Sequence, residues 1–468
     1  MWAVVVTLFV YQALLLGLGW WARGRARTTQ GYFIGDRELG PWVGALSYAA
    51  GSSSAWSILG VSGIAFSQGV SSFWLIPGTL TGHLVVWFWI APHLHKQSHK
   101  HRWVTLTDML AFELPQKVAA LTYRLSAVVI LFSFTFYIAA QFQGAANTFT
   151  SIFAFDFTTA LLLGAAVVLV YTLWGGFWAV SLTDAMQAGL MLVACIVLPV
   201  FAWHAAGGWG AIDAALSAGS AEYGHWLGGH GGWFGIGFLL GMVSIGFGPL
   251  GQPHLLNRVM ALKSPADVRL ARRVALTWFI LVLCGMYVLG ICGHMLVEHT
   301  SDPEQVFFAL AQQLMPAVIT GVLIAAVLSA IMSTADSQLL VAGAALHHDL
   351  YRAGAAKPIS PRLAVVGVAM AAVLLALYLP ESIFSRVLFA WNALGAAFGP
   401  VVLARLLNWR PRPWAVPAAI GLGFGLTAVF YSLPNGPGDL WERAIPFVVA
   451  VATLWLPRQQ IDATITRP

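Results

Sequence analysis

The chain has 468 residues, of which 59% are hydrophobic and only 9% are charged, with a formal net charge of +6 and a mean hydropathy of +0.77. A soluble protein carries roughly 25% charged residues, so this composition excludes a soluble enzyme, a disordered chain and a disulfide scaffold. It also excludes an outer-membrane barrel, whose short alternating strands give a weaker apolar signal. The sequence therefore predicts an all-α polytopic membrane protein, because helices satisfy their own backbone hydrogen bonds in lipid.

Apolar runs long enough to cross a bilayer recur along the whole sequence. The first is followed by basic residues and has no small-residue cleavage site. We therefore interpret it as a retained transmembrane helix whose N-terminus lies on the outer side of the membrane, and not as a signal peptide. We expect thirteen transmembrane helices, near residues 2–22, 40–64, 70–92, 118–142, 157–175, 184–206, 228–250, 273–296, 316–345, 362–380, 383–406, 413–431 and 444–457.

The positions of the basic residues support this number of spans, because Lys and Arg gather in cytoplasmic loops. With thirteen spans and an outside N-terminus, only Arg386 and Arg443 of the 24 Lys and Arg residues fall outside the cytoplasmic set. That set includes Arg258 and the basic residues of the His-rich stretch 93–102, which we interpret as a topology-setting loop rather than a metal site. The sequence thus predicts a multi-pass protein of a bacterial-type inner membrane, with a cytoplasmic C-terminus and no nucleic-acid partner.

The loops are too short for a separate domain, so we expect residues 1–468 to form a single transmembrane transporter domain. Two outside loops are expected to hold short helices, one within about 207–227 and the other an amphipathic lid at Asp302–Leu314. Three cysteines lie in apolar segments without metal-like spacing, and we interpret them as buried free thiols: Cys195, Cys284 and Cys292.

Two of the expected spans contain helix-breaking sequences. The second is interrupted by Gly51-Ser52-Ser53-Ser54, and the seventh by the glycines and prolines between Gly246 and Pro253. Glycine, proline and serine each weaken the helical backbone ladder. Breaks at corresponding places in two groups of five spans indicate an inverted-repeat transporter with its site at the breaks, although ordinary kinks are an alternative. The repeats would cover about 40–206 and about 228–408.

Two acidic residues, Asp184 and Asp336, lie within spans. A carboxylate is energetically costly there, so each is expected to have a functional or structural role. Asp184 could instead cap a helix start, and Asp336 could make an isolated structural hydrogen bond. The ninth span also places Ala330, Ser333, Thr334 and Ser337 on one helical face. Such oxygen atoms suit a hard cation such as Na⁺, but small and hydroxyl residues also serve helix packing.

The sequence shows no nucleophile–base pair, zinc motif or phosphate loop, which argues against an enzyme. The remaining alternatives are a secondary active transporter and a transporter-like sensor of a small solute that works through a separate partner. We expect a monomer whose partners are a small-molecule solute and the lipid bilayer.

Several stretches in order resemble the sodium:solute symporter family, and within it the bacterial sodium/proline symporters. They are Tyr32 through Gly40, Tyr171 through Asp184, Gly251-Gln252-Pro253-His254, Met332 through Leu340, and Gly395 through Pro400. The resemblance implies a LeuT-like fold of five-plus-five inverted repeats, with one extra helix before and two after. It also implies Na⁺-coupled symport of a small organic solute, either an amino acid of the proline type or a small carboxylate, into the cytoplasm by alternating access.

The resemblance further implies which residues bind the ions. A first Na⁺ site would use the carbonyl groups of Ala50, Ser53 and Ala330 with the hydroxyls of Ser333 and Thr334. A second would use Asp184, Ser333, Asp336 and Ser337. Arg37 matches a position tied to coupling, and Tyr137 a gating or substrate position.

The chain departs from the proline branch at the first break, where Ser52 stands in place of an acid. We expect a substrate cavity with neutral polar groups and ring surfaces, which suits a small zwitterion or carboxylate. Its residues would be Ser52, Ser54, Trp56, Phe73, Tyr137, Gln141 and Phe247.

Overall fold

The computed structural model describes residues 2–22, 28–153, 155–218, 222–298, 302–354, 359–378, 383–434 and 436–455, and its regular elements there are all helical. Leu39 and Leu262 add one isolated bridge within this part of the chain. Six of the basic residues assigned to the cytoplasmic side lie outside the described residues: Arg23, Arg25, Arg27, Lys357, Arg458 and Arg467.

The α-helices are α1 (Trp2–Ala22), α2 (Thr29–Ile34), α3 (Pro41–Ser52), α4 (Val61–Gln68), α5 (Leu75–Val85), α6 (Ala91–His101), α7 (Leu106–Leu110), α8 (Gln116–Phe153), α9 (Phe157–Ala205), α10 (Gly208–Ala218), α11 (Gly232–Ser244), α12 (Pro253–Ala261), α13 (Pro265–Leu296), α14 (Val306–Leu314), α15 (Ala317–Ala344), α16 (Leu350–Arg352), α17 (Pro361–Tyr378), α18 (Ile383–Leu406), α19 (Ala415–Tyr431) and α20 (Leu440–Trp455). Short 3₁₀ or π turns join them: η2 (Gly35–Arg37), η3 (Trp56–Gly60), η4 (Gly69–Trp74), η5 (Val86–Ile90), η6 (Ile245–Gly251), η7 (Pro303–Gln305), η8 (Ala345–Asp349) and η9 (Pro437–Asp439).

The predicted all-α membrane architecture is confirmed. Among the described residues, 9 helices are long and apolar enough to cross a membrane, and Phe157–Val170 and Ala415–Tyr431 are shorter apolar helices. The fifth and sixth expected spans run together as α9, with a kink at Gly176, whose φ of 57° and ψ of −162° are accessible to glycine. Both helices expected in the outside loops are present, as α10 and as η7 with α14.

Two interpretations of the sequence that concern α6 and α13 were wrong. The His-rich stretch is helix α6 and not a loop, because it contains no breaker between the first-turn Pro92 and Arg102, where φ becomes 56°. His95 and His99 lie one turn apart, with Nε2 atoms 2.9 and 3.1 Å from the carbonyl oxygen of Leu262. Cys195 and Cys292 are buried as expected, but Cys284 is exposed, because it lies on an outward face of α13.

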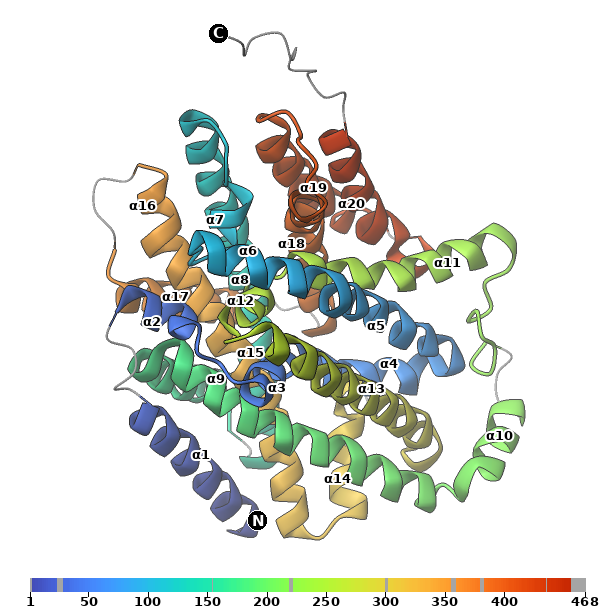
Figure 1. Cartoon of the computed structure of the whole chain (residues 1–468). Helices are drawn as coiled ribbons and strands as arrows, with labels where there is room; N and C mark the ends of the chain where they lie inside the picture. The colour runs from blue at the N-terminus through green and yellow to red at the C-terminus, as the bar shows by residue number, and fades with distance from the viewer. Residues whose placement is uncertain are drawn as a thin grey trace, which may run out of the picture.

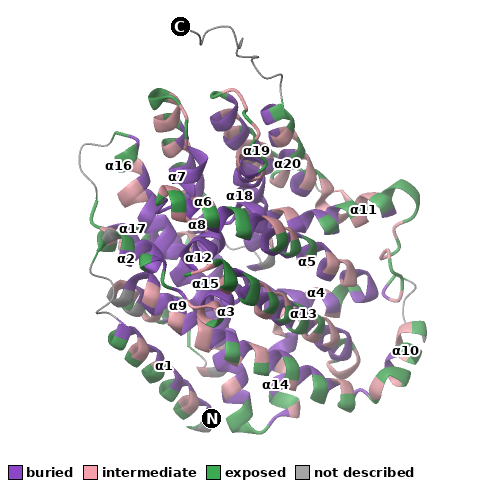
Figure 2. Cartoon of the chain, in the orientation of Figure 1, coloured by how far each residue is buried: buried purple, intermediate pink, exposed green. Residues whose placement is uncertain are grey.

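Buried residues concentrate on α3, α12, α15 and α18, which form the centre of the molecule (Figure 2). On α15, every residue from Leu323 through Ala344 is buried, hydroxyl and carboxylate side chains included. Helix α1 lies at the periphery against α9 and α15 (Figure 1). The two breaks that the sequence predicts therefore fall in the most enclosed layer of the fold.

Candidate functional site

The first break interrupts the second predicted span in the middle of the protein. Helix α3 ends at Ser52, and Ser53 has a φ of −108° and a ψ of 82°, which are not helical. Side chains of α8 satisfy the freed groups: the Gln141 Oε1 atom accepts a hydrogen bond from Ala55 N at 3.2 Å, and the Tyr137 hydroxyl donates to Ser54 Oγ at 3.3 Å. A non-helical segment at this depth is tolerated because protein groups replace water as its partners.

The second break lies at η6, where the chain forms a 3₁₀ turn before Gln252 becomes extended and α12 begins at Pro253. Trp391 of α18 fixes it, because its indole N–H donates to Ile245 O at 3.2 Å and its carbonyl accepts from Gln252 Nε2 at 3.1 Å. Gly248 is needed here, since a Cβ atom would lie 1.8 Å from the Trp391 indole nitrogen. The breaks meet where His254 Nε2 lies 3.1 Å from Gly51 O.

A cluster of neutral oxygen atoms lies between the first break and α15. The Ser333 hydroxyl is 3.2 Å from Ala50 O and 3.3 Å from Ala330 O. The Thr334 hydroxyl is 3.4 Å from Ala50 O and 3.3 Å from Gly51 O. These separations exceed the 2.7–2.8 Å or so that is usual for O–H···O hydrogen bonds. Oxygen atoms held together in this way are the ligands that hard cations prefer.

The structure thus brings together most residues of the predicted first sodium site, and their neutral oxygen atoms are of the kind that fits Na⁺. Four of its five residues provide the clustered oxygens, with Gly51 O as an addition. Ser53 lies at the same break, where its backbone N–H donates to Ala49 O and Ala50 O, each at 3.0 Å.

Of the predicted second sodium site, Asp184, Asp336 and Ser337 also lie together, while Ser333 contacts the first cluster. A guanidinium group lies among the three. Arg258 NH2 is 3.1 Å from Asp184 Oδ2 and donates to Ser337 Oγ. The Ser337 hydroxyl also contacts Asp336 Oδ1 at 3.1 Å. Ser47 completes the cluster, donating to Asp184 Oδ2 at 2.7 Å and accepting from Arg258 Nε at 3.1 Å.

Arg258 was wrongly placed by the sequence analysis, which counted it among cytoplasmic loop charges. Its side chain is only 1% exposed, because α12 re-enters the protein after the second break and continues to Ala261. Two signals in the sequence could have identified it: the flanking apolar residues of α12, and the need of a buried Asp184 for a counter-charge.

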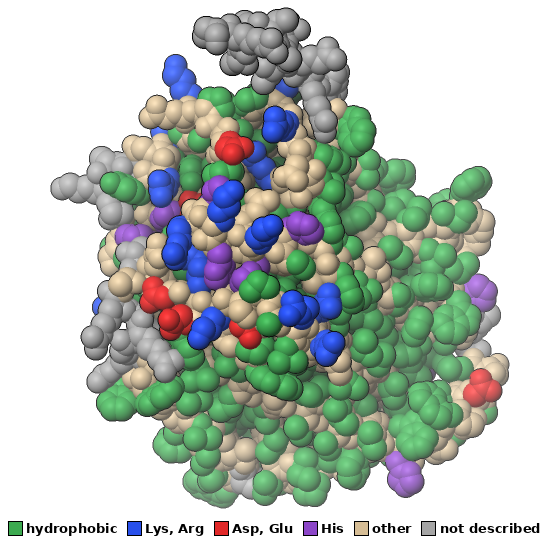
Figure 3. Space-filling model, viewed as in Figure 1, with side chains coloured by type: hydrophobic (Ala, Val, Ile, Leu, Met, Phe, Trp, Pro, Cys, Tyr) green, Lys and Arg blue, Asp and Glu red, His purple; other side chains and the backbone are tan. Residues whose placement is uncertain are grey.

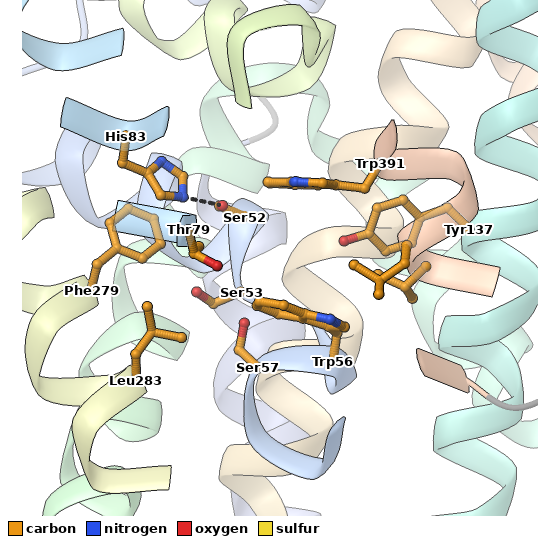
Figure 4. A pocket seen from close by; sticks show the side chains of 12 residues that line it. Ser52, Ser53, Trp56, Ser57, Thr79, His83, Tyr137, Phe279, Leu283 and Trp391 are labelled. Carbon is orange, nitrogen blue, oxygen red and sulfur yellow. Dashed lines mark hydrogen bonds between the residues drawn. The ribbon is translucent and has the colours of Figure 1, made fainter. Parts of the chain in front are cut away.

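A narrow, largely closed cavity lies beside the first break (Figure 4). In Figure 4 the indole rings of Trp391 and Trp56 lie on opposite sides of it, with Phe279 and Leu283 toward one end and Tyr137 toward the other. Its lining residues are Ser52, Ser53, Trp56, Ser57, Thr79, His83, Tyr137, Phe279, Leu283, Val387, Leu388 and Trp391. None of these described residues is acidic, Lys or Arg, so the cavity suits a solute with no net charge.

His83 is the polar group that the sequence analysis missed. It is fully buried, its Nε2 atom lies 3.4 Å from Ser52 Oγ, and its Nδ1 atom lies 3.1 Å from the Tyr48 hydroxyl. Its ring stacks on Phe279 with a centroid separation of 3.9 Å. Thr79, one turn earlier on α5, has a buried hydroxyl without a hydrogen-bond partner among the described residues. The position of this imidazole within an otherwise apolar span could have identified His83 from the sequence.

The predicted substrate residues divide into three groups. Ser52, Trp56 and Tyr137 line the cavity, while Ser54 and Gln141 hold the broken backbone. The two phenylalanines lie elsewhere, Phe73 against Trp226 and Tyr287, and Phe247 stacked on Phe447.

Arg37, the predicted coupling residue, lies outside both clusters. Its side chain is buried, its φ is 60°, and NH2 donates to the carbonyl oxygen of Trp103 at 2.5 Å. It therefore connects η2 to the segment between α6 and α7.

Comparison with known sequences identifies similar proteins across nearly the whole chain. The model of the sodium:solute symporter family matches residues 32–410. The osmoregulated proline transporter OpuE of Bacillus subtilis is 34% identical over 432 residues, which cover 90% of this chain and 87% of that protein. The sodium/proline symporter of Escherichia coli is 36% identical over 421 residues, with 86% and 82% covered.

Comparison with solved structures indicates the same type of fold. A substrate-bound, outward-open Na⁺-coupled sialic acid symporter superposes with a TM-score of 0.79 at 15% identity, covering 97% of this chain and 98% of that one. A closed nucleobase-cation-symport-1 transporter, Mhp1, gives a TM-score of 0.57 at 14% identity, with 91% and 92% covered. These likenesses establish a transporter fold of the LeuT type for the described helices.

Proposed function

The chain belongs to the sodium:solute symporter family, and we propose that it carries a small solute of the proline type, or a small carboxylate, into the cytoplasm together with Na⁺. The observation that carries this proposal is the neutral oxygen cluster of Ala50, Ser333 and Thr334 at the first break. This cluster lies next to a cavity that Ser52 and Ser53 of the same break line. In this arrangement, Na⁺ binding and solute binding act on the same segment of backbone and are coupled through it.

The solute is proposed from the cavity and from the relatives. The relatives named above are described as proline transporters or sodium/proline symporters, and the cavity offers hydroxyls, an imidazole and aromatic faces without a formal charge. A zwitterion suits it because η3, which begins at Trp56, presents a helix start beside the cavity, where a carboxylate is favoured. Ser52 and Thr79 then supply hydroxyls for the rest of the solute.

A second sodium ion at Asp184, Ser333, Asp336 and Ser337 is also a proposal. It requires the Arg258 guanidinium to leave Ser337 and Asp184, with which it is bonded in this conformation. Such an exchange of one cation for another would accompany a conformational change of α12.

The finer topology is proposed as thirteen spans, with inverted repeats at about 40–206 and about 228–408, one helix before them and two after. The two breaks, at η3 and η6, support this arrangement because they fall at corresponding places in the repeats. The charge distribution favours an outside N-terminus and a cytoplasmic C-terminus in a bacterial-type inner membrane. We propose that the protein functions as a monomer and has no enzymatic activity.

Uptake into proteoliposomes tests the proposed function. The purified chain would be reconstituted and supplied with labelled proline and a panel of amino acids and small carboxylates, with and without an inward Na⁺ gradient. We expect accumulation of at least one solute that stops when the Na⁺ gradient is abolished. Binding without accumulation would contradict symport and would favour a solute sensor.

A further inference from the structure

A basic hollow lies at the ends of α6 and α18, away from the cation cluster and the solute cavity. Its lining includes Lys96 and Lys100 of α6, Arg405 of α18, and Arg410 of the α18–α19 connection. The hollow is open to solvent, and water-sized molecules can reach about 900 Å³ of space in it. Lys, Arg and His side chains gather over α6, α7 and α12 on the face shown in Figure 3, whereas the lower part of that face is mainly hydrophobic.

The four cations of this hollow share a single lining carboxylate within the part of the chain that the structure describes. None of the four forms an ion pair there, and Glu113 is the one carboxylate among the lining residues. Arg405 is half-buried: NH2 donates to Leu110 O at 3.1 Å, but its buried Nε has no hydrogen-bond partner among the described residues. A partly desolvated guanidinium with an unbonded nitrogen is unfavourable, and its planar set of N–H donors suits a phosphate group.

The hollow lies at the level where apolar helices end. The apolar segments Trp56–His101 and Ser385–Leu406 end at it, and Ala415–Tyr431 begins just beyond it. The ends of transmembrane helices lie at the membrane–water interface, where Trp side chains are enriched. Trp409 of the lining packs on Trp455 at a centroid separation of 5.2 Å, and Trp414, which follows the lining residue Pro413 in the sequence, is 48% exposed.

We propose that this hollow binds the phosphate headgroup of an anionic phospholipid from the membrane leaflet on that side. Lys96, Lys100, Arg405 and Arg410 surround the phosphate, and the exposed Trp414 lies beside the acyl chains. Basic pockets at the ends of transmembrane helices recognise anionic headgroups through this combination of charge and interfacial position. A free phosphate ion shares the anion chemistry but makes no use of the neighbouring apolar rim.

A bound headgroup would also restrain the segment that Arg37 contacts. Trp103 lines the hollow, and its carbonyl oxygen accepts the Arg37 hydrogen bond. His101 packs against both Trp103 and Phe112, with centroid separations of 5.3 and 4.4 Å. The lipid site is therefore in contact with the α6–α7 connection through a packed aromatic group.

Native mass spectrometry of the full-length protein tests the proposal. Protein would be released from micelles that contain phosphatidylglycerol and phosphatidylcholine at equal concentrations, with or without millimolar inorganic phosphate. The test variant is Lys96→Gln/Lys100→Gln/Arg410→Gln. The control variant, Lys263→Gln/Arg269→Gln/Arg273→Gln, removes the same charge from exposed residues at and after the α12–α13 turn.

We expect one phosphatidylglycerol to be retained in preference to phosphatidylcholine, and phosphate not to displace it. The test variant should retain about tenfold less phosphatidylglycerol, whereas the control variant should behave like the wild type. An equal loss in both variants would overturn the proposal, since it would indicate general attraction to a basic face. Displacement by inorganic phosphate would also overturn it, because the site would then belong to a soluble anion.

Discussion

The Arg258 guanidinium lies 3.1 Å from the Asp184 carboxylate, and both side chains are almost completely buried. The pair joins α12 to α9, and Ser47 and Ser337 connect it to α3 and α15. Arg258 also donates to His254 O at 2.7 Å, and the His254 ring contacts Gly51 O at the first break. A continuous polar chain thus runs from the ion pair to the oxygen cluster that we propose binds Na⁺.

Removal of either partner of this pair alone should lower the stability of the folded protein more than expected from the effect of removing both. Arg258→Gln or Asp184→Asn leaves one buried charge without its partner, which costs about 3–5 kcal/mol. The double variant removes both charges of the pair together, so its loss of stability should be well below the sum of the two single losses. Thermal unfolding of the purified variants in detergent would measure this coupling.

The exposed Arg269→Gln change on the same side of the protein is the control and should leave the unfolding temperature close to that of the wild type. Additive losses in the double variant would show that the two side chains do not stabilise the fold as a pair.

The sequence predicted the breaks because glycine, proline and serine act on the local backbone. It also predicted the hydroxyl face of α15, because Ala330, Ser333 and Thr334 recur with helical spacing. It did not predict that Arg258 is buried, since the direction that α12 takes after Pro253 depends on packing against α3 and α15. Charge counting therefore assigned this residue to a loop.

The lining of the cavity beside the first break was predicted only in part, for a similar reason. Ser52, Trp56 and Tyr137 were recognised because they lie at the break or on the helix opposite it. Phe73 and Phe247 were included as nearby aromatics, but their rings pack against Trp226 and Phe447 instead. Which face of an apolar helix a ring occupies is decided by tertiary contacts, and a uniformly apolar span carries little information about it.

Replacing both hydroxyls of the oxygen cluster should weaken Na⁺ coupling. In Ser333→Ala/Thr334→Ala, two of the proposed neutral ligands are lost, and the alanine side chains supply no ligand in their place. We expect the Na⁺ concentration for half-maximal uptake to rise by about tenfold or more, since each hydroxyl ligand contributes on the order of 1 kcal/mol. Thr427→Ala, which removes a buried hydroxyl bonded within α19, should leave that concentration unchanged. Full uptake driven by a pH gradient in Na⁺-free buffer would contradict the assignment of Na⁺ as the coupling ion.

Asp108, in the short helix α7 between spans, should make stability depend on acid pH. Burial acts to raise its pKa, but hydrogen bonds from His348, Tyr123 and Val104 N outweigh this and lower the pKa to about 2. Because the folded-state pKa lies below the ordinary value, the carboxylate stabilises the protein above about pH 4, and this contribution is lost as the pH falls toward 2. The contribution of this carboxylate to the free energy of unfolding is about 2 kcal/mol.

Thermal unfolding at pH 5 and pH 3 would check this expectation with Asp108→Asn as the comparison. The wild type should lose more stability than the variant over this interval, because only the wild type has the carboxylate at position 108 whose stabilising contacts are lost on protonation. Equal losses would show that Asp108 is not stabilised by its neighbours.

His83 should contribute to solute affinity more than to Na⁺ affinity. It lines the solute cavity, and its described polar contacts are with Ser52 and Tyr48, whereas the oxygen cluster involves other residues. His83→Gln retains a hydrogen-bonding side chain, and His83→Leu does not. We expect the solute concentration for half-maximal uptake to rise about tenfold in His83→Leu and less in His83→Gln. Unchanged solute affinity in a well-expressed His83→Leu protein would contradict a role in binding.

Ser52→Asp should change which solutes are accepted. The new carboxylate would lie in the cavity beside His83, whose Nε2 atom is 3.4 Å from the present hydroxyl. A buried carboxylate costs several kcal/mol unless it is paired, so it should favour solutes with a cationic group and disfavour anionic ones. Expression and unfolding temperature must be measured first, because the unpaired charge also destabilises the fold. A competition assay with a panel of amino acids and carboxylates at fixed Na⁺ would then compare the mutant with the wild type. If a well-folded mutant keeps the same rank order and the same affinities, Ser52 does not contact the solute, and selectivity must come from His83, Thr79 and the aromatic walls.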